Sequence, residues 1–223
     1  MRSIFPDSII RFVNARTIIW LSNPAYWIMQ RRTQSILENL KNRLSEYVPD
    51  PKYKHDSFII LCLQQAFIAA EEGNFGVGAI LVDNSQGSIL HARNKVFHPY
   101  FRTDRHAEME VITEFEMSSK GAVVPASHTL FSSLEPCPMC LTRILISGVG
   151  TTFYAAANEA GGMGGLLGHL PHTLQRYAEQ KVIGPADCSP VLRSIAWQIF
   201  EINTTDDSER LMSTRDTIKP QQD

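Results

Sequence analysis

Residues 134–140 read Leu-Glu-Pro-Cys-Pro-Met-Cys, and residues 106–108 read His-Ala-Glu. Together the two segments supply the imidazole of His106, the thiols of Cys137 and Cys140, and the carboxylate of Glu108. A zinc ion that activates water is usually held by three protein ligands, whereas a structural zinc has four. The sequence therefore predicts one catalytic Zn2+ per chain, held by His106, Cys137 and Cys140. Glu108 is left to act as general acid and base outside the ligand set.

Both segments are predicted to begin helices. Apolar residues recur at helical spacing after His106, and again after Cys137 as far as Gly148, where a glycine ends the second helix. Two prolines flank Cys137 at positions that suit a first helical turn. Cys137 and Cys140, three residues apart, then share one helix face. Two helix N-termini aimed at one metal favour thiolate over thiol. Because His106 and Glu108 would diverge in mid-helix, we expect the metal beyond the helix end, where both can converge.

Each half of this pattern alone is a weak signal. A Cys-x-x-Cys pair could be a redox pair, which needs no metal. A structural zinc would need a fourth ligand from Cys62, Cys188 or a further histidine. The combination in this order, with a proline before the first cysteine, favours the catalytic zinc.

Composition is typical of a compact enzyme with appendages. The chain has 223 residues, of which 43% are hydrophobic and 20% charged, and its net charge of −2 gives no general attraction to nucleic acid. Four cysteines, two of them assigned to metal, make no disulfide framework, so we expect a reducing, cytoplasmic location. The hydrophobic stretch Ile9–Met29 is interrupted by charged and polar residues, which favours a packed appendage over a membrane anchor.

Helices alternate with strands along the chain, which indicates an α/β protein. We expect a helical N-terminal extension and linker over residues 1–52, a catalytic domain over 53–203, and a polar, disordered tail over 204–223. A helix capped by Asp56 or Ser57 opens the catalytic domain. Strands are predicted at 76–82, 88–94, 128–134, 149–157 and 181–183, with further helices at 171–180 and 191–202. The helix between the last two strands makes them parallel.

Residues from about 54 to 200 resemble the cytidine/deoxycytidylate deaminase superfamily, nearest its branch of guanine deaminases and tRNA adenosine deaminases. The resemblance rests on strand 77–82, Asn94, the His-Ala-Glu segment and residues 134–140. It implies a three-layer α-β-α fold around a mixed five-stranded sheet with strands 4 and 5 parallel. It also implies a hydrolytic deaminase, working as a homodimer, that replaces an exocyclic amine by a carbonyl and releases ammonia. In such an enzyme Asn94 and the backbone N–H of Ala107 contact the base.

Two departures from the family pattern concern the base pocket and leave the metal chemistry intact. Arg-Thr-Asp-Arg at 102–105 precedes His106 where members often carry Asp-Pro-Thr-Ala, and Gly76 stands where a proline is common. The acidic side chains of Asp206, Asp207 and Glu209 do not suit an RNA-binding surface. We therefore expect a small-molecule nucleobase or nucleoside, with a purine such as guanine preferred. Adenosine in tRNA is the first alternative, cytosine compounds the second, and a non-catalytic zinc module the third.

Several pocket assignments have a plainer alternative. Asn94 could cap its own backbone in a turn. Glu159, in the glycine-rich segment 158–165, either hydrogen-bonds an amino-substituted base or lies on a solvated connection. Four aromatic residues could stack on a base, although their spacing favours the core: Phe153, Tyr154, Trp197 and Phe200.

Overall fold

The computed structural model describes residues 24–121 and 124–216. The chain divides after Asn42 into two compact units, and helix α2 (Pro24–Ser45) begins in the first of them. Most of the stretch Ile9–Met29 lies outside the described residues, and the predicted domain limits stay a prediction. Over the described part of the chain, no helix has both the length and the apolar character that crossing a membrane requires.

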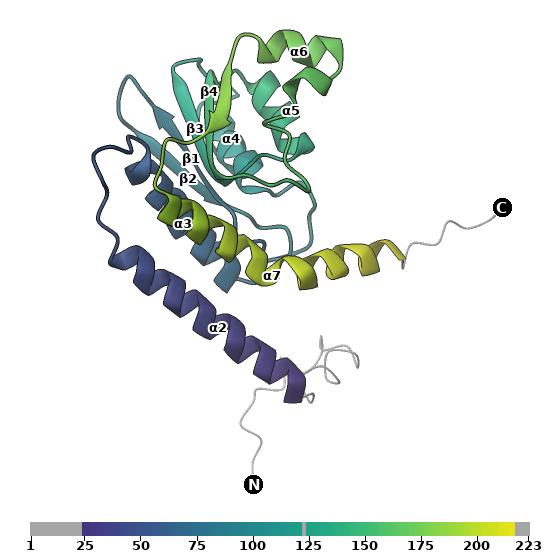
Figure 1. Cartoon of the computed structure of the whole chain (residues 1–223). Coiled ribbons are helices and arrows are strands. Elements are labelled where there is room, and N and C mark those ends of the chain that lie inside the picture. The colour runs from purple at the N-terminus through teal and green to yellow at the C-terminus, as the bar shows by residue number, and fades with distance from the viewer. Residues whose placement is uncertain (1–23, 122–123, 217–223) are drawn as a thin grey trace, which may run out of the picture. The chain divides into compact units, whose positions relative to one another are not determined.

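A mixed sheet in the order β2-β1-β3-β4-β5 forms the centre of the second unit (Figure 1). Its strands are β1 (Gly78–Asp83), β2 (Ile89–Arg93), β3 (His128–Leu134), β4 (Thr151–Ala156) and β5 (Val182–Pro185). Strand β1 pairs antiparallel with β2 and β3, whereas β3, β4 and β5 are parallel neighbours. The predicted five-stranded mixed sheet, with strands 4 and 5 parallel, is confirmed.

Helices cover both faces of this sheet, which makes the predicted three-layer α-β-α arrangement. Helices α3 (Asp56–Glu71) and α7 (Pro190–Asp216) pack together on one face. On the other face α4 (Ala107–Ser118) packs beside α5 (Pro138–Ser147), which also contacts α6 (His172–Ala178). A 3₁₀ turn, η2 (Leu167–His169), precedes α6. The largest fully buried side chains of this unit are Ile59, Leu63, Ile80, Leu81, Ile112, Leu130, Leu141, Ile144, Leu192, Ile195 and Ile199.

The start of α3 differs from the prediction. His55 occupies the N-cap position without a capping side-chain bond, and Asp56 is already the first helical residue. The Asp56 carboxylate is buried and accepts hydrogen bonds from the Tyr47 hydroxyl (2.5 Å) and the Ser189 backbone N–H (2.8 Å). A buried carboxylate requires such partners, and here distant residues satisfy it in place of the local helix end.

Helix α7 runs past its predicted end at Ile202 as far as Asp216, into the segment for which the sequence predicts disorder. Residues 203–216 contain neither glycine nor proline, so no local stop signal interrupts the helix there. Residues 217–223 lie outside the described part of the chain.

Gly78 lets α3 lie directly against the backbone of β1. A Cβ atom at this position would lie 2.1 Å from the Cys62 carbonyl oxygen and 2.6 Å from the Ala66 nitrogen. Both atoms belong to α3, so the strand and this helix approach each other closely at the glycine. The contact keeps α3 close to the sheet, on the face opposite α4 and α5.

Candidate metal centre and active site

The helix starts place the predicted ligands next to one another. His106 and Cys137 are the N-cap residues of α4 and α5, both with extended backbone, and Cys140 lies in the first turn of α5. Neither N-cap side chain caps its own helix. They meet instead: the Sγ atoms of Cys137 and Cys140 lie 3.6 Å and 3.5 Å from His106 Nδ1. The predicted helix starts are confirmed.

The three side chains fit a zinc ion. Their ligand atoms all lie within 4.8 Å of one another. A tetrahedral zinc with ordinary Zn–S and Zn–N bond lengths separates its sulfur and nitrogen ligands by about 3.6 Å, which is the spacing observed here. In the described part of the chain this group has no fourth protein ligand, and the Cys62 thiol donates instead to the Phe131 carbonyl at 3.4 Å. The donor set therefore matches an open, catalytic type of site.

Glu108 lies beside this group and outside it. Its side chain is only 3% exposed. The Ser132 hydroxyl on β3 donates to Glu108 Oε1 at 3.0 Å, and the Cys140 thiol donates to Oε2 at 3.4 Å. The sequence patterns predict no role for Ser132. The available signal was a pair of serines, 132 and 133, at the end of an otherwise apolar strand that leads to the cysteines.

The four groups perturb one another strongly. The hydrogen bond from Cys140, and then the one with His106, lowers the pKa of Cys137, while the pKa of Cys140 is raised because it keeps the shared proton. Burial acts to lower the pKa of His106, but the hydrogen bond with Cys137 and the nearby negative charges of Cys137, Glu108 and Asp104 together raise it. Burial raises the pKa of Glu108. A divalent cation would favour the thiolates and the carboxylate, so the cluster is charge-complementary to a metal.

The turn that contains Asn94 is joined by one backbone hydrogen bond to the residue before His106. The Asn94 side chain is buried, and its Oδ1 accepts a hydrogen bond from the Val96 backbone N–H at 3.0 Å. The next residue, Lys95, donates its backbone N–H to the Arg105 carbonyl at 2.9 Å, which ties this turn to the residue before His106. Asn94 therefore makes the local turn contact that its plainer alternative describes, and its contact with a base stays a prediction.

The other predicted substrate contacts differ in their surroundings. Ala107 is buried and is the first residue of α4. Its N–H therefore belongs to the helix start, where backbone donors have no intrahelical acceptor. Glu159 is exposed on the connection after β4. Both contacts stay predictions.

The four aromatic candidates pack against protein. The Phe153 ring lies 4.4 Å from the His55 ring and 5.7 Å from the Phe131 ring, measured between centroids. Tyr154 is buried, and Trp197 pairs with Phe200 at 5.7 Å. Tyr154 therefore belongs to the core, whereas the other three are partly buried and contact neighbouring side chains.

A pocket of about 650 Å³ follows α4 from its start. Four cations line it, and each is paired with a carboxylate. The pairs are Lys95 with Glu110 (3.1 Å), Arg105 with Glu110 (2.7 Å), Arg102 with Asp104, and Arg143 with Glu116 (2.5 Å). The pairing neutralises much of the positive charge that a polyanion would need.

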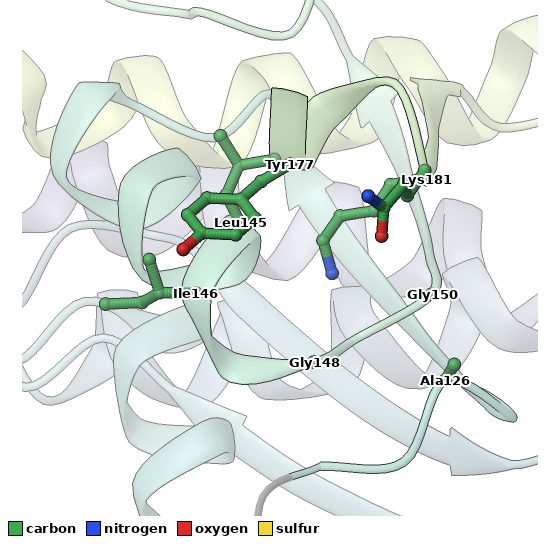
Figure 2. Close-up of a pocket in the computed structure, with 8 residues that line it drawn as sticks. Ala126, Leu145, Ile146, Gly148, Gly150, Tyr177 and Lys181 are labelled. Atoms are coloured by element: carbon green, nitrogen blue, oxygen red, sulfur yellow. The ribbon is translucent and has the colours of Figure 1, made fainter. Parts of the chain in front are cut away.

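A second pocket, of about 320 Å³, lies at the other end of α5 (Figure 2). Leu145 and Gly148 from the end of that helix line it, together with Tyr177 and Lys181. The Lys181 ammonium donates to the Val149 carbonyl at 2.5 Å, and burial lowers its pKa. Because Cys137 begins the helix whose last residues line this pocket, the pocket is separate from the metal group.

Comparison with known proteins connects this geometry to a family. Residues 52–156 match the model of the cytidine and deoxycytidylate deaminase zinc-binding region. A tRNA-specific adenosine deaminase of Bacillus subtilis is 34% identical over 108 residues, which cover 48% of this chain and 65% of the relative. Another, from Rickettsia felis, is 30% identical over 102 residues, covering 45% of this chain and 69% of the relative.

In several of these relatives the matched region is only part of the whole protein. The chain spans 65% of the Bacillus relative but only 22% and 10% of two longer curated relatives. Among solved structures, a guanine deaminase from Nitrosomonas europaea superposes with a TM-score of 0.51 at 18% identity, covering 71% of this chain and 87% of that one. This likeness shows the shared fold.

Proposed function

This chain belongs to the cytidine and deoxycytidylate deaminase family, and we propose that it is a zinc-dependent hydrolytic deaminase of a nucleobase or nucleoside. One observation carries the proposal. His106, Cys137 and Cys140 converge at two helix starts, and the buried carboxylate of Glu108 lies against them without joining the group. Three ligands and one adjacent proton carrier are what water activation requires.

In the proposed reaction, water adds to the ring carbon that bears an exocyclic amine. When bound, zinc supplies the Lewis-acid chemistry that makes a water molecule nucleophilic near neutral pH. Glu108 removes a proton from that water and then delivers protons to the ring nitrogen and to the departing amine. A carbon–oxygen bond forms, the carbon–nitrogen bond breaks, and ammonia leaves. The Ser132 hydroxyl holds Glu108 Oε1 in place, so that Oε2 faces the ligand side.

We propose a free purine base or nucleoside, such as guanine, as the substrate. The chain has a net charge of −2, and each of the four cations that line the pocket along α4 is paired with a carboxylate, which favours a small neutral substrate over a polyanion. In this proposal the Ala107 N–H, at the start of α4, holds an exocyclic oxygen, and Asn94 and Glu159 supply further contacts to the base.

Adenosine in tRNA is the second candidate, because the Bacillus and Rickettsia relatives bear the name tRNA-specific adenosine deaminase. We also propose a homodimer in a reducing, cytoplasmic compartment, where the two thiolates would persist. Exposed apolar side chains on α4 and α5, such as Met117 and Ile146, are available for contact with a second copy. A mass of one chain in light scattering at working concentration would contradict the dimer.

The deciding experiment measures ammonia release by zinc-loaded protein from guanine, adenine, cytosine, their nucleosides and a tRNA anticodon stem-loop. Glu108→Ala should keep zinc and fold while turnover falls to background. Glu179→Gln, a change of an exposed carboxyl on the surface near α6, should leave turnover unchanged. Activity on the stem-loop alone would replace the small-molecule proposal by RNA deamination, and activity on cytosine compounds alone would replace the purine. Silence throughout, with zinc bound, would favour a non-catalytic zinc module.

A further inference from the structure

Glu135, at the end of β3, is a buried carboxylate whose two oxygens have different partners. Its side chain is 9% exposed. Oε2 accepts the backbone N–H of Asn158 at 2.9 Å, and Oε1 accepts the backbone N–H of Gly165 at 3.1 Å. Its own backbone N–H donates to the Ala156 carbonyl at 2.8 Å, which anchors Glu135 to β4. One carboxylate thus holds both ends of residues 158–165, hereafter the glycine loop.

The middle of the glycine loop is tied to the chain just before the metal ligands. The Met163 backbone N–H donates to the Pro136 carbonyl at 2.9 Å, and Pro136 directly precedes Cys137. Within the loop, Gly162 N–H donates to the Asn158 carbonyl at 2.7 Å. The loop therefore contacts Glu135 and Pro136 at three points along its length.

Two glycines are required for this close approach, and a third is not. A Cβ atom at Gly162 would lie 2.4 Å from the carboxyl carbon and from Oε2 of Glu135, and one at Gly164 would lie 2.8 Å from the Tyr154 ring. Both distances are shorter than real contacts allow. At Gly165 a Cβ atom would meet nothing within 4 Å. The loop is shaped around the Glu135 carboxylate.

We propose that Glu135 is a positioning residue, which holds the glycine loop as one wall of the substrate site beside the metal ligands; this rests on the proposed function. The carboxylate suits the task because both of its oxygens accept, and a charged acceptor makes the stronger hydrogen bonds. A glutamine of the same shape has one acceptor oxygen and an NH2 group that would face a backbone donor. Replacing Glu135 by glutamine therefore releases one end of the glycine loop without creating a cavity.

The first test does not depend on turnover. In Glu135→Gln, hydrogen exchange at the amides of Asn158 and Gly165 should quicken by about tenfold or more at one or both positions. Zinc content should stay at one ion per chain. Glu179→Gln, which changes an exposed carboxyl on the surface near α6, is the matched control and should leave both amides unchanged. Unchanged exchange in Glu135→Gln would overturn the proposal, even if no substrate is ever found.

The second test places the loop at the substrate site. With a substrate identified, Gly162→Ala and Glu135→Gln should raise KM about tenfold with kcat changed by less than about threefold, because uniform binding is lost. Gly168→Ala lies outside the glycine loop and has room for the methyl group, so its KM should equal that of the wild type. Faster exchange with an unchanged KM would show that Glu135 merely stabilises a remote loop and would overturn the proposal. Failure of the deaminase assignment itself appears separately, as absence of turnover in the wild type.

Discussion

The Ser132→Ala substitution tests how Glu108 is held. The Ser132 hydroxyl donates to Glu108 Oε1 at 3.0 Å, where both side chains are buried. A hydrogen bond to a charged group contributes about 1.5–3 kcal/mol, and leaving the carboxylate without it lets the side chain turn away from the reacting position. If that contribution is realised in the transition state, kcat should fall by roughly 10- to 150-fold. Zinc content should not change, because Ser132 contacts no ligand atom of the metal group.

Ser133 supplies a matched control on the same strand. Its hydroxyl oxygen accepts the backbone N–H of Gly78 at 3.1 Å. Ser133→Ala therefore leaves the buried Gly78 N–H of β1 without its acceptor. We expect this to lower the free energy of unfolding by roughly 1–3 kcal/mol while kcat stays close to the wild-type value. The assay is steady-state ammonia release with the substrate that the panel identifies, accompanied by urea unfolding of each variant. Equal kcat values for Ser132→Ala and wild type would refute the role assigned to Ser132.

Three further predictions concern the frame around the site. Gly78→Ala should lower the free energy of unfolding by about 1–3 kcal/mol or more in urea, because the new methyl group would overlap the Cys62 carbonyl of α3; an unchanged midpoint would contradict this packing. Burial lowers the pKa of His55 from 6.5, so the unfolded chain binds more protons, and stability should fall as pH drops below about 6.5 until the lower folded pKa is passed. His55→Gln should flatten that part of the stability curve, and an equally steep curve would count against the shift. Protein kept in free zinc at a hundredfold its dissociation constant should have an unfolding free energy roughly 2–3 kcal/mol higher than protein treated with a chelator. In Cys137→Ala this difference should disappear.

Much of the fold and the metal group follows from local patterns. Proline before Cys137 and glycine at Gly148 bracket α5, and the apolar spacing after His106 identifies α4, because helix ends leave residue-level signatures. The parallel pairing of β4 with β5 follows from the helix between them. Asp56 shows where such rules fail: a residue suited to capping is drawn into a buried network with Tyr47 instead.

The contacts that the sequence does not reveal join residues far apart in the chain. Ser132 bonds a carboxylate 24 positions earlier, and Glu135 bonds amides 23 and 30 positions later. No periodicity or capping rule encodes these pairs, because they arise only when β3 lies between β1 and β4 and brings its polar end to the helix starts. The zinc ligands are easier to identify, since three donor types at fixed spacing already define a chemistry.

The zinc ligands and Glu108 lie at helix starts, and Ser132 lies on the central strand. This placement has a consequence for evolution. These residues sit on elements that neighbouring strands and helices hold on both sides, whereas the turn around Asn94 and the glycine loop are connections at the rim. Mutations accumulate more readily in connections than in such elements. Under the proposed function, a lineage with this architecture can change which amine it accepts through a few substitutions in these connections and keep the reaction itself.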